Sequence, residues 1–187
     1  MNRSQGISST DVIDNILSTK FQKVQELYEH GARHFLFIYV PNIDKSPLNK
    51  DNSLYFANSD VTYYNTKVKA FGSNFASTHP DTNVLIYDAY MEYNYIIDHK
   101  DEFGIENVAD SCQDSGSKCD KKDSTYFWYD KIQPSVRVQE ALAQDLHEFL
   151  TSRQVTVIDE QYNSGAFSVK SFLFWNAILV LFSFLLF

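Results

Sequence analysis

The segment from Tyr126 to Ser135 comes closest to a catalytic arrangement of side chains. It reads Tyr-Phe-Trp-Tyr-Asp-Lys-Ile-Gln-Pro-Ser, which places the carboxylate of Asp130 three residues before Gln133. A carboxylate can orient a histidine that acts as the general base for a serine nucleophile. A histidine three residues after the carboxylate could complete such a pair, but the glutamine amide cannot take a proton from a hydroxyl near neutral pH. Asp130 and Gln133 are therefore the candidate site residues of this segment, without a general base.

Both residues have less specific interpretations. As alternatives, Asp130 could cap the helix expected from Pro134 or be a solvated loop acid. As an alternative, the amide of Gln133 could bind a ligand.

The remaining titratable residues form no second catalytic set. The five histidines are scattered along the sequence, so we expect structural or surface roles for His30, His34, His79, His99 and His147. Cys112 and Cys119 lie in a polar segment without a histidine, which does not suit a metal site. We expect a disulfide, which implies an oxidising compartment, with free thiols as the alternative. No metal and no cofactor is predicted.

Hydrophobic periodicity predicts an α/β domain over residues 1–153. The expected elements are a helix Asp11–His30 capped by Ser9 or Thr10, a strand His34–Val40, a helix with its stripe at Tyr64–Phe75, a strand Asn83–Tyr87, a helix Met91–Phe103 and a helix from Pro134 to Leu150. This order is typical of parallel strands joined by right-handed crossovers. Two strands are few for such a sheet, however, because these sheets usually have about five.

The amino-acid composition limits the kinds of molecule that the protein is expected to bind. A net charge of -8 argues against nucleic acid, because phosphate binding needs a basic surface. The 12 tyrosines and 15 phenylalanines suit a carbohydrate-active domain, and equally an ordinary aromatic core.

The C-terminus is apolar. Phe172–Phe187 carries no charge, and as a helix it would span about 24 Å, less than the roughly 30 Å hydrocarbon core of a bilayer. The small residues Asn163, Ser164 and Gly165 precede it, as in a lipid-anchor signal. A tail-anchored membrane helix and a buried hydrophobic helix are the alternatives. We expect 154–170 to be a linker and 171–187 a membrane-attachment segment.

The expected cellular location depends on the N-terminal segment. Met1–Thr10 is polar and has no apolar signal-peptide core. We expect a membrane-attached protein at the cell surface or in the secretory pathway if a signal peptide lies upstream, and a tail-anchored protein otherwise.

Several stretches together resemble one enzyme family. They are Gln25–Phe37, Ser46–Leu48, Tyr64–Thr66, Val84–Tyr87, and the cysteine pair followed by Phe127–Asp130. In this order, over about Asp11–Leu150, they resemble the C-terminal half of SGNH (GDSL) hydrolases of the fungal carbohydrate-esterase, or acetylesterase, branch. The resemblance implies a partial flavodoxin-like three-layer fold without its N-terminal strands, followed by a C-terminal hydrophobic helix.

The resemblance also implies an activity and what it requires. Such enzymes remove acetyl groups from esters, with a serine in a Gly-Asp-Ser block and an oxyanion donor in a Gly-x-Asn-Asp block. Neither block occurs in these 187 residues. Asp130 would be the remaining triad aspartate, and Gln133 would stand where the histidine belongs. We therefore expect an ester-hydrolase relative that is catalytically inactive as this chain.

Two other hypotheses remain open. A membrane-tethered, non-catalytic carbohydrate-binding or interaction module could use Tyr126, Trp128 and Tyr129 to stack on a saccharide, although the same residues suit a core. Alternatively, the chain does not fold alone, because the strand Phe35–Val40 would have an unpaired sheet edge that invites association.

Overall fold

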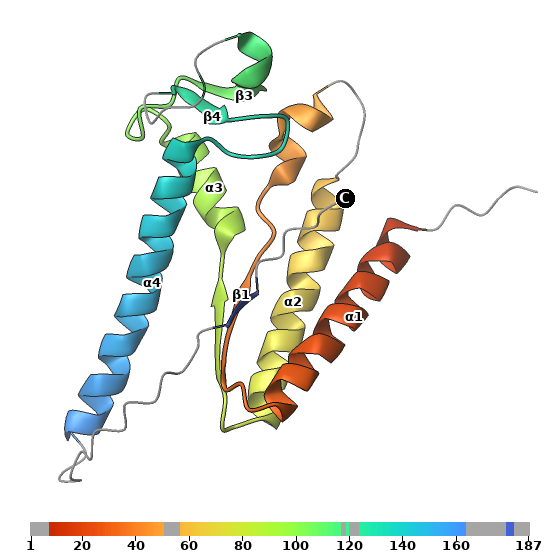
Figure 1. The fold of residues 1–187 in the computed structure, drawn as a ribbon, viewed down its shortest axis with the longest axis vertical. Coiled ribbons are helices and arrows are strands. Elements are labelled where there is room, and N and C mark those ends of the chain that lie inside the picture. The colour runs from red at the N-terminus through yellow and green to blue at the C-terminus, as the bar shows by residue number, and fades with distance from the viewer. Residues whose placement is uncertain (1–7, 51–56, 117–118, 120–123, 164–178, 182–187) are drawn as a thin grey trace, which may run out of the picture. The chain divides into compact units, whose positions relative to one another are not determined.

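The computed structural model describes residues 8–50, 57–116, 119, 124–163 and 179–181, with side chains described as far as residue 152. The chain divides into two compact units, considered separately below. The first unit combines Met1–Asp98 with Ala177–Phe187, and the second unit is His99–Asn176. Both contain helices and a small parallel sheet, which makes the protein mixed α/β (Figure 1).

The first unit is built on a parallel sheet. Its elements are α1 (Ser9–Glu29), β1 (His34–Ile38), the short 3₁₀ turns η1 (Ile43–Lys45) and η2 (Pro47–Asn49), α2 (Asn58–Thr78), β2 (Asn83–Tyr87), α3 (Ala89–Asp98) and β5 (Leu179–Leu181). The strand order is β2-β1-β5, and Leu36 of β1 stands opposite Leu85 on one side and Val180 on the other.

The predicted helix Asp11–His30 is confirmed as α1, but its cap is different. The Ser8 hydroxyl accepts a hydrogen bond from the Thr10 main-chain N–H, so the helix begins at Ser9. The strand predicted over His34–Val40 ends earlier, at Ile38. Val40 makes hydrogen bonds to Asn65 of α2 in place of further sheet pairing. The Val40 N–H donates to Asn65 Oδ1 at 2.9 Å, and the Val40 carbonyl accepts from Asn65 Nδ2 at 2.8 Å.

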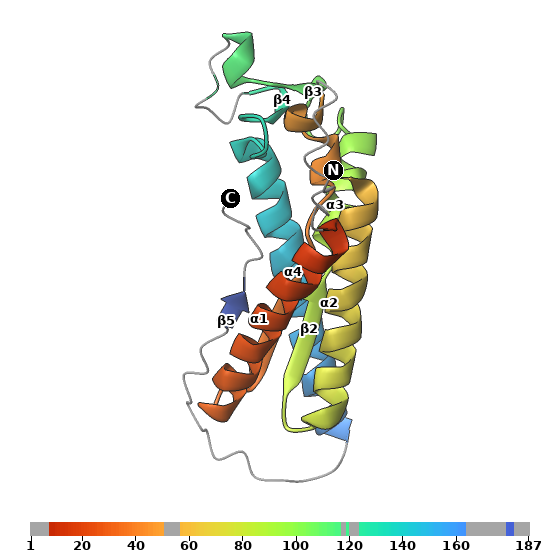
Figure 2. The same cartoon turned by 90° about the vertical axis from the view of Figure 1, so that its right-hand side faces the viewer.

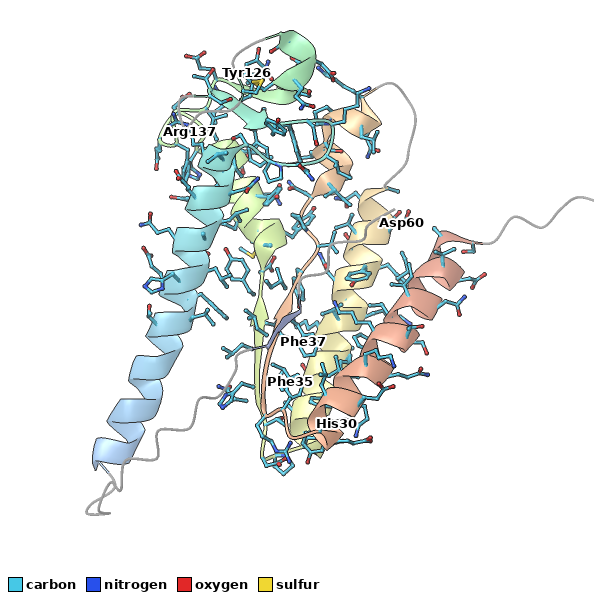
Figure 3. The ribbon with its side chains drawn as sticks, in the orientation of Figure 1. His30, Phe35, Phe37, Asp60, Tyr126 and Arg137 are labelled. Atoms are coloured by element: carbon cyan, nitrogen blue, oxygen red, sulfur yellow. A yellow bond between two sulfur atoms is a disulfide. The ribbon has the colours of Figure 1, made fainter. Side chains whose placement is uncertain are left out.

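The core of the first unit lies between β1 and the two long helices. Figures 1 and 2 show α1 and α2 running side by side along one face of the sheet. Phe35 and Phe37 point toward these helices (Figure 3) and are buried in their cluster. The rings of Phe21 and Phe71 stack with centroids 3.7 Å apart, which joins α1 to α2. This apolar burial is the main stabilising contribution of the unit.

The second unit contains two strands that the sequence did not reveal. It holds β3 (Asn107–Ser111), the 3₁₀ turn η3 (Gln113–Ser115), β4 (Tyr126–Trp128) and α4 (Val136–Asn163), with β3 and β4 parallel. The helix expected from Pro134 begins two residues later, at Val136, because Pro134 bridges to Trp128. The helix α4 continues to Asn163, inside the range 154–170, and the division of the chain at residue 153 stays a prediction.

The third helix also differs from its expected range of Met91–Phe103. It begins at Ala89 and ends at Asp98. The chain then turns, with the Ile105 N–H donating to the Lys100 carbonyl at 2.8 Å and Gly104 in a left-handed conformation at φ 63°. A positive φ favours glycine, so Gly104 suits the end of this turn.

The C-terminal hydrophobic helix expected over 171–187 is not seen in the part that the structure describes. There, Leu179–Leu181 form β5, paired in parallel with Phe35–Phe37. A sheet edge offers unpaired main-chain groups, and an apolar segment can satisfy them. The edge of β1 that the sequence left open is thus covered along these residues. Ser164 and Gly165 lie outside the described residues, and Asn163 ends α4. None of the described helices has the length and apolar character to cross a membrane.

Candidate functional site

The aromatic part of the Tyr126–Ser135 segment is anchored in the second unit. Phe127 and Trp128 are both 0% exposed. The Trp128 indole N–H donates to the Val108 carbonyl at 3.0 Å, and the Trp128 carbonyl accepts from the Cys112 N–H at 3.0 Å. Trp128 is therefore a core residue in this conformation, with no free ring face for a saccharide. Tyr126 is half-buried.

The predicted disulfide between Cys112 and Cys119 is confirmed. The two Cα atoms are 5.6 Å apart, and both residues are buried. The bond closes the loop that connects β3 to β4. Because the Cys112 N–H also bonds the Trp128 carbonyl, the disulfide is fastened directly to the aromatic strand.

Asp130 organises the turn that follows β4. Its Oδ1 accepts hydrogen bonds from the main-chain N–H groups of Ile132, at 2.8 Å, and Gln133, at 2.7 Å. The Tyr129 N–H donates to the Gln133 carbonyl at 2.8 Å, which tightens the same turn. An aspartate that accepts main-chain bonds two and three residues ahead is a turn-forming residue by its own chemistry.

The same turn fixes the position of Gln133. Its main-chain N–H meets Asp130, while its side chain is exposed. The Ser135 N–H donates to the Phe127 carbonyl at 2.7 Å, so the turn is held at both ends before α4 begins. The turn fixes the main chain at position 133, but an amide side chain there supplies no general base.

The described histidines and acidic residues add no catalytic set. His30 Nδ1 lies 2.7 Å from the Glu26 carbonyl, and His79 Nδ1 lies 3.1 Å from the Phe75 carbonyl. Each histidine thus caps the end of its own helix, as expected for a structural role. Among the residues that the structure describes, no group of three or more His, Cys, Asp or Glu side chains could hold a metal ion.

A polar network at the carboxyl end of β1 was missed by the sequence reasoning. Asn94 Oδ1 accepts from Asn42 Nδ2 at 2.7 Å and from Lys45 Nζ at 2.7 Å. Asn58 Nδ2 donates to Asp44 Oδ2 at 3.2 Å. We call these residues, together with Tyr90 and Ser46, the carboxyl-edge network. The available signal was the Pro41-Asn42 pair directly after a parallel strand, since ligands of α/β sheets gather at the carboxyl ends of strands.

Asn58 connects the network to α3. Its Nδ2 also donates to the Tyr90 hydroxyl at 2.9 Å. The network therefore connects the loop after β1, the start of α2, and α3.

Nearby in sequence, Asp88 has a structural role, because its Oδ1 accepts from the Met91 N–H at 2.9 Å at the start of α3. Burial and, secondly, the charge of Asp88 raise the pKa of Tyr39.

Comparison with known proteins shows a weak similarity to an esterase. No protein-family profile matches the chain. An acetylesterase of Thermothelomyces thermophilus is 24% identical over 137 residues, which cover 71% of this chain and 43% of the relative. The chain thus matches less than half the length of this relative. The similarity supports a distant relationship to esterases.

Proposed function

We propose that this chain is an esterase-related domain of the SGNH type, and that it does not hydrolyse esters as it stands. The relationship to an acetylesterase and the parallel α/β architecture support the family. The order of a disulfide, an aromatic strand and the Asp130 turn supports the finer assignment. We infer from the sequence resemblance that the ancestral substrates were acetyl esters of sugars.

The observation that carries the proposal is the Asp130 turn with Gln133 at its end. Acyl transfer needs a nucleophile, a base within hydrogen-bond reach, and donors at the developing oxyanion. Asp130 supplies at most the orienting carboxylate. The 187-residue sequence contains neither Gly-Asp-Ser nor Gly-x-Asn-Asp. In a serine hydrolase, loss of the nucleophile or the base alone costs about a millionfold in turnover.

The test combines active-site labelling with an attempted repair. The purified chain is treated with a fluorophosphonate probe and assayed with p-nitrophenyl acetate. We expect no labelled serine and no turnover above buffer. Gln133→His is expected to restore nothing, because the new imidazole has no serine to activate.

A matched control separates real catalysis from the weak background reaction of any imidazole. Gln144→His places the same group at an exposed position on α4. Hydrolysis by Gln133→His that clearly exceeds hydrolysis by Gln144→His, or stoichiometric labelling of one serine in either protein, would show that the inactive assignment is wrong.

Membrane attachment through residues 171–187 is a further part of the proposal. It is supported by the uncharged sequence Phe172–Phe187. The chain expressed in a eukaryotic secretory system behind a signal peptide should enter the detergent phase on Triton X-114 partition, and a variant ending at residue 163 should remain aqueous. Release by a phosphatidylinositol-specific phospholipase distinguishes a lipid anchor from a membrane helix. Equal partition of both forms into the aqueous phase would refute attachment.

A further inference from the structure

Three buried oxygen atoms of the carboxyl-edge network have no hydrogen-bond partner among the described residues. They are Asn42 Oδ1, Asp44 Oδ1 and Ser46 Oγ. Asn42 is 0% exposed and Ser46 is 2% exposed. Buried polar atoms are nearly always satisfied by protein or by ordered water, so three such atoms within one turn indicate that a group normally sits there.

The chemistry of these atoms favours a hard cation. An amide oxygen, a carboxylate oxygen and a hydroxyl oxygen are the ligand types that Ca²⁺ takes in proteins. They stand at alternate positions, Asn42-x-Asp44-x-Ser46, which is the spacing of the first three ligands of a calcium-binding loop. The intervening backbone is the 3₁₀ turn η1. Asn42 and Ser46 are the residues that flank this turn, so at about 2 Å of rise per residue their Cα atoms lie within about 8 Å.

We propose that Asn42, Asp44 and Ser46 form a Ca²⁺-binding site at the carboxyl end of β1. The site has a single carboxylate, and the Lys45 ammonium lies next to it on Asn94. Both features place its affinity with the weak sites of extracellular modules, at a dissociation constant of about 10⁻⁴–10⁻³ M. This inference does not depend on the proposed esterase relationship.

Binding would have a mechanical consequence. Asp44 already holds Asn58 at the start of α2, and Asn42 holds Asn94 on α3. An ion that draws Asn42, Asp44 and Ser46 together would fix the loop between β1 and α2 against both helices. Ca²⁺ should therefore stabilise the folded state.

The first experiment is thermal unfolding of the full chain. The protein is stripped with EDTA, dialysed, and heated with and without 10 mM CaCl₂. An affinity in the stated range predicts a rise in melting temperature of about 3–10 °C. Terbium binding, detected as luminescence excited through tyrosine and displaced by Ca²⁺, is the second readout. An unchanged melting temperature and no displaceable luminescence would mean that the atoms are satisfied by water, and would overturn the proposal.

Variants distinguish a built site from the general attraction of an acidic protein for cations. Asp44→Asn removes one charge with almost no change in shape, and should abolish the Ca²⁺-dependent shift and weaken terbium binding by at least about tenfold. Asp60→Asn makes the same charge change in the first turn of α2 (Figure 3), where the carboxylate accepts from Ser9 Oγ, and should keep both responses. Equal loss in the two variants, or none in Asp44→Asn, would overturn the proposal.

A gain-of-binding variant covers the case in which Asp44→Asn fails to fold. Asn42→Asp removes the amide donor to Asn94 but adds a second carboxylate at a ligand position, and it should increase the Ca²⁺-dependent shift, because affinity rises with the charge of the ligand set. A shift equal to or smaller than that of the unmodified chain would contradict the assignment of Asn42 as a ligand.

Discussion

Among single substitutions that truncate a polar side chain of α2, the replacement of Asn65 should destabilise the first unit most. Its amide donates to the Val40 carbonyl at 2.8 Å and accepts from the Val40 N–H at 2.9 Å, and both bonds are buried. Asn65→Ala leaves both main-chain groups without this partner. A buried polar group left unsatisfied costs about 1–3 kcal/mol, so the two together predict a loss of about 2–6 kcal/mol.

The loss is large compared with the stability of a typical domain, which is about 5–15 kcal/mol. Urea denaturation followed by far-UV circular dichroism gives the free energy of unfolding of the Asn65→Ala variant and of the unmodified chain. The slope of the free energy against urea should stay the same, because the substitution changes stability without changing the surface exposed on unfolding. The midpoint should fall.

Asn74→Ala is the matched control, since Asn74 lies exposed on the same helix. It should change the free energy of unfolding by less than about 0.5 kcal/mol, as is usual for surface positions, and alanine's helix propensity favours the variant. If Asn65→Ala and Asn74→Ala have equal midpoints, then the Asn65 clamp contributes nothing, and the explanation for the end of β1 at Ile38 is wrong.

The disulfide and the Asp81 carboxylate give two further predictions. Replacing both Cys112 and Cys119 with serine should lower the free energy of unfolding by about 2–3 kcal/mol in the chain-entropy model for so short a loop, and a reducing agent should leave the variant unchanged while it lowers the midpoint of the unmodified chain. Desolvation opposes ionisation of Asp81, but the hydrogen bond from Tyr28 and the charge of Arg33 outweigh it and lower the pKa. The stabilisation by Asp81 is therefore present above the unfolded pKa of about 3.9 and is lost as the pH falls through the lower folded value. Unfolding of Asp81→Asn measured from pH 7 to pH 2 should show the largest deficit at neutral pH and none at the acid end, and a deficit independent of pH would contradict this.

Strong periodicity made the first unit largely predictable. The helices α1 and α2 could be predicted because their apolar positions repeat at the helical period, and the strand β2 because it is a continuous apolar run. Their ends were less predictable, because side chains outside the repeating positions set them. Ser8 caps α1, one residue before Ser9 and two before Thr10, the expected caps, and Asn65 bonds Val40 beyond the end of β1.

The second unit was harder to predict for a physical reason. β3 contains Asn107, Asp110 and Ser111, which are poor strand residues, and β4 is only Tyr126–Trp128. They pair because the chain around them is held by the disulfide and by the Trp128 indole. No local pattern expresses such support.

The carboxyl-edge network shows the same limitation at the level of a site. Its members come from a loop, the start of α2 and α3, and they meet through long-range hydrogen bonds such as Asn42 to Asn94 and Asn58 to Asp44. Single asparagines spaced this far apart have no sequence signature. The alternate spacing of Asn42, Asp44 and Ser46 is visible in the sequence, but it gains meaning only with the burial of their oxygens.

The Tyr126–Ser135 segment is held in place by structural contacts alone. Trp128 fills the core, Asp130 closes a turn through main-chain amides, and Pro134 bridges back to the strand. Each of these roles serves folding and none requires a proton acceptor at position 133. A glutamine there leaves the main-chain N–H that Asp130 binds unchanged. The contacts that hold this segment therefore do not depend on which side chain stands at position 133.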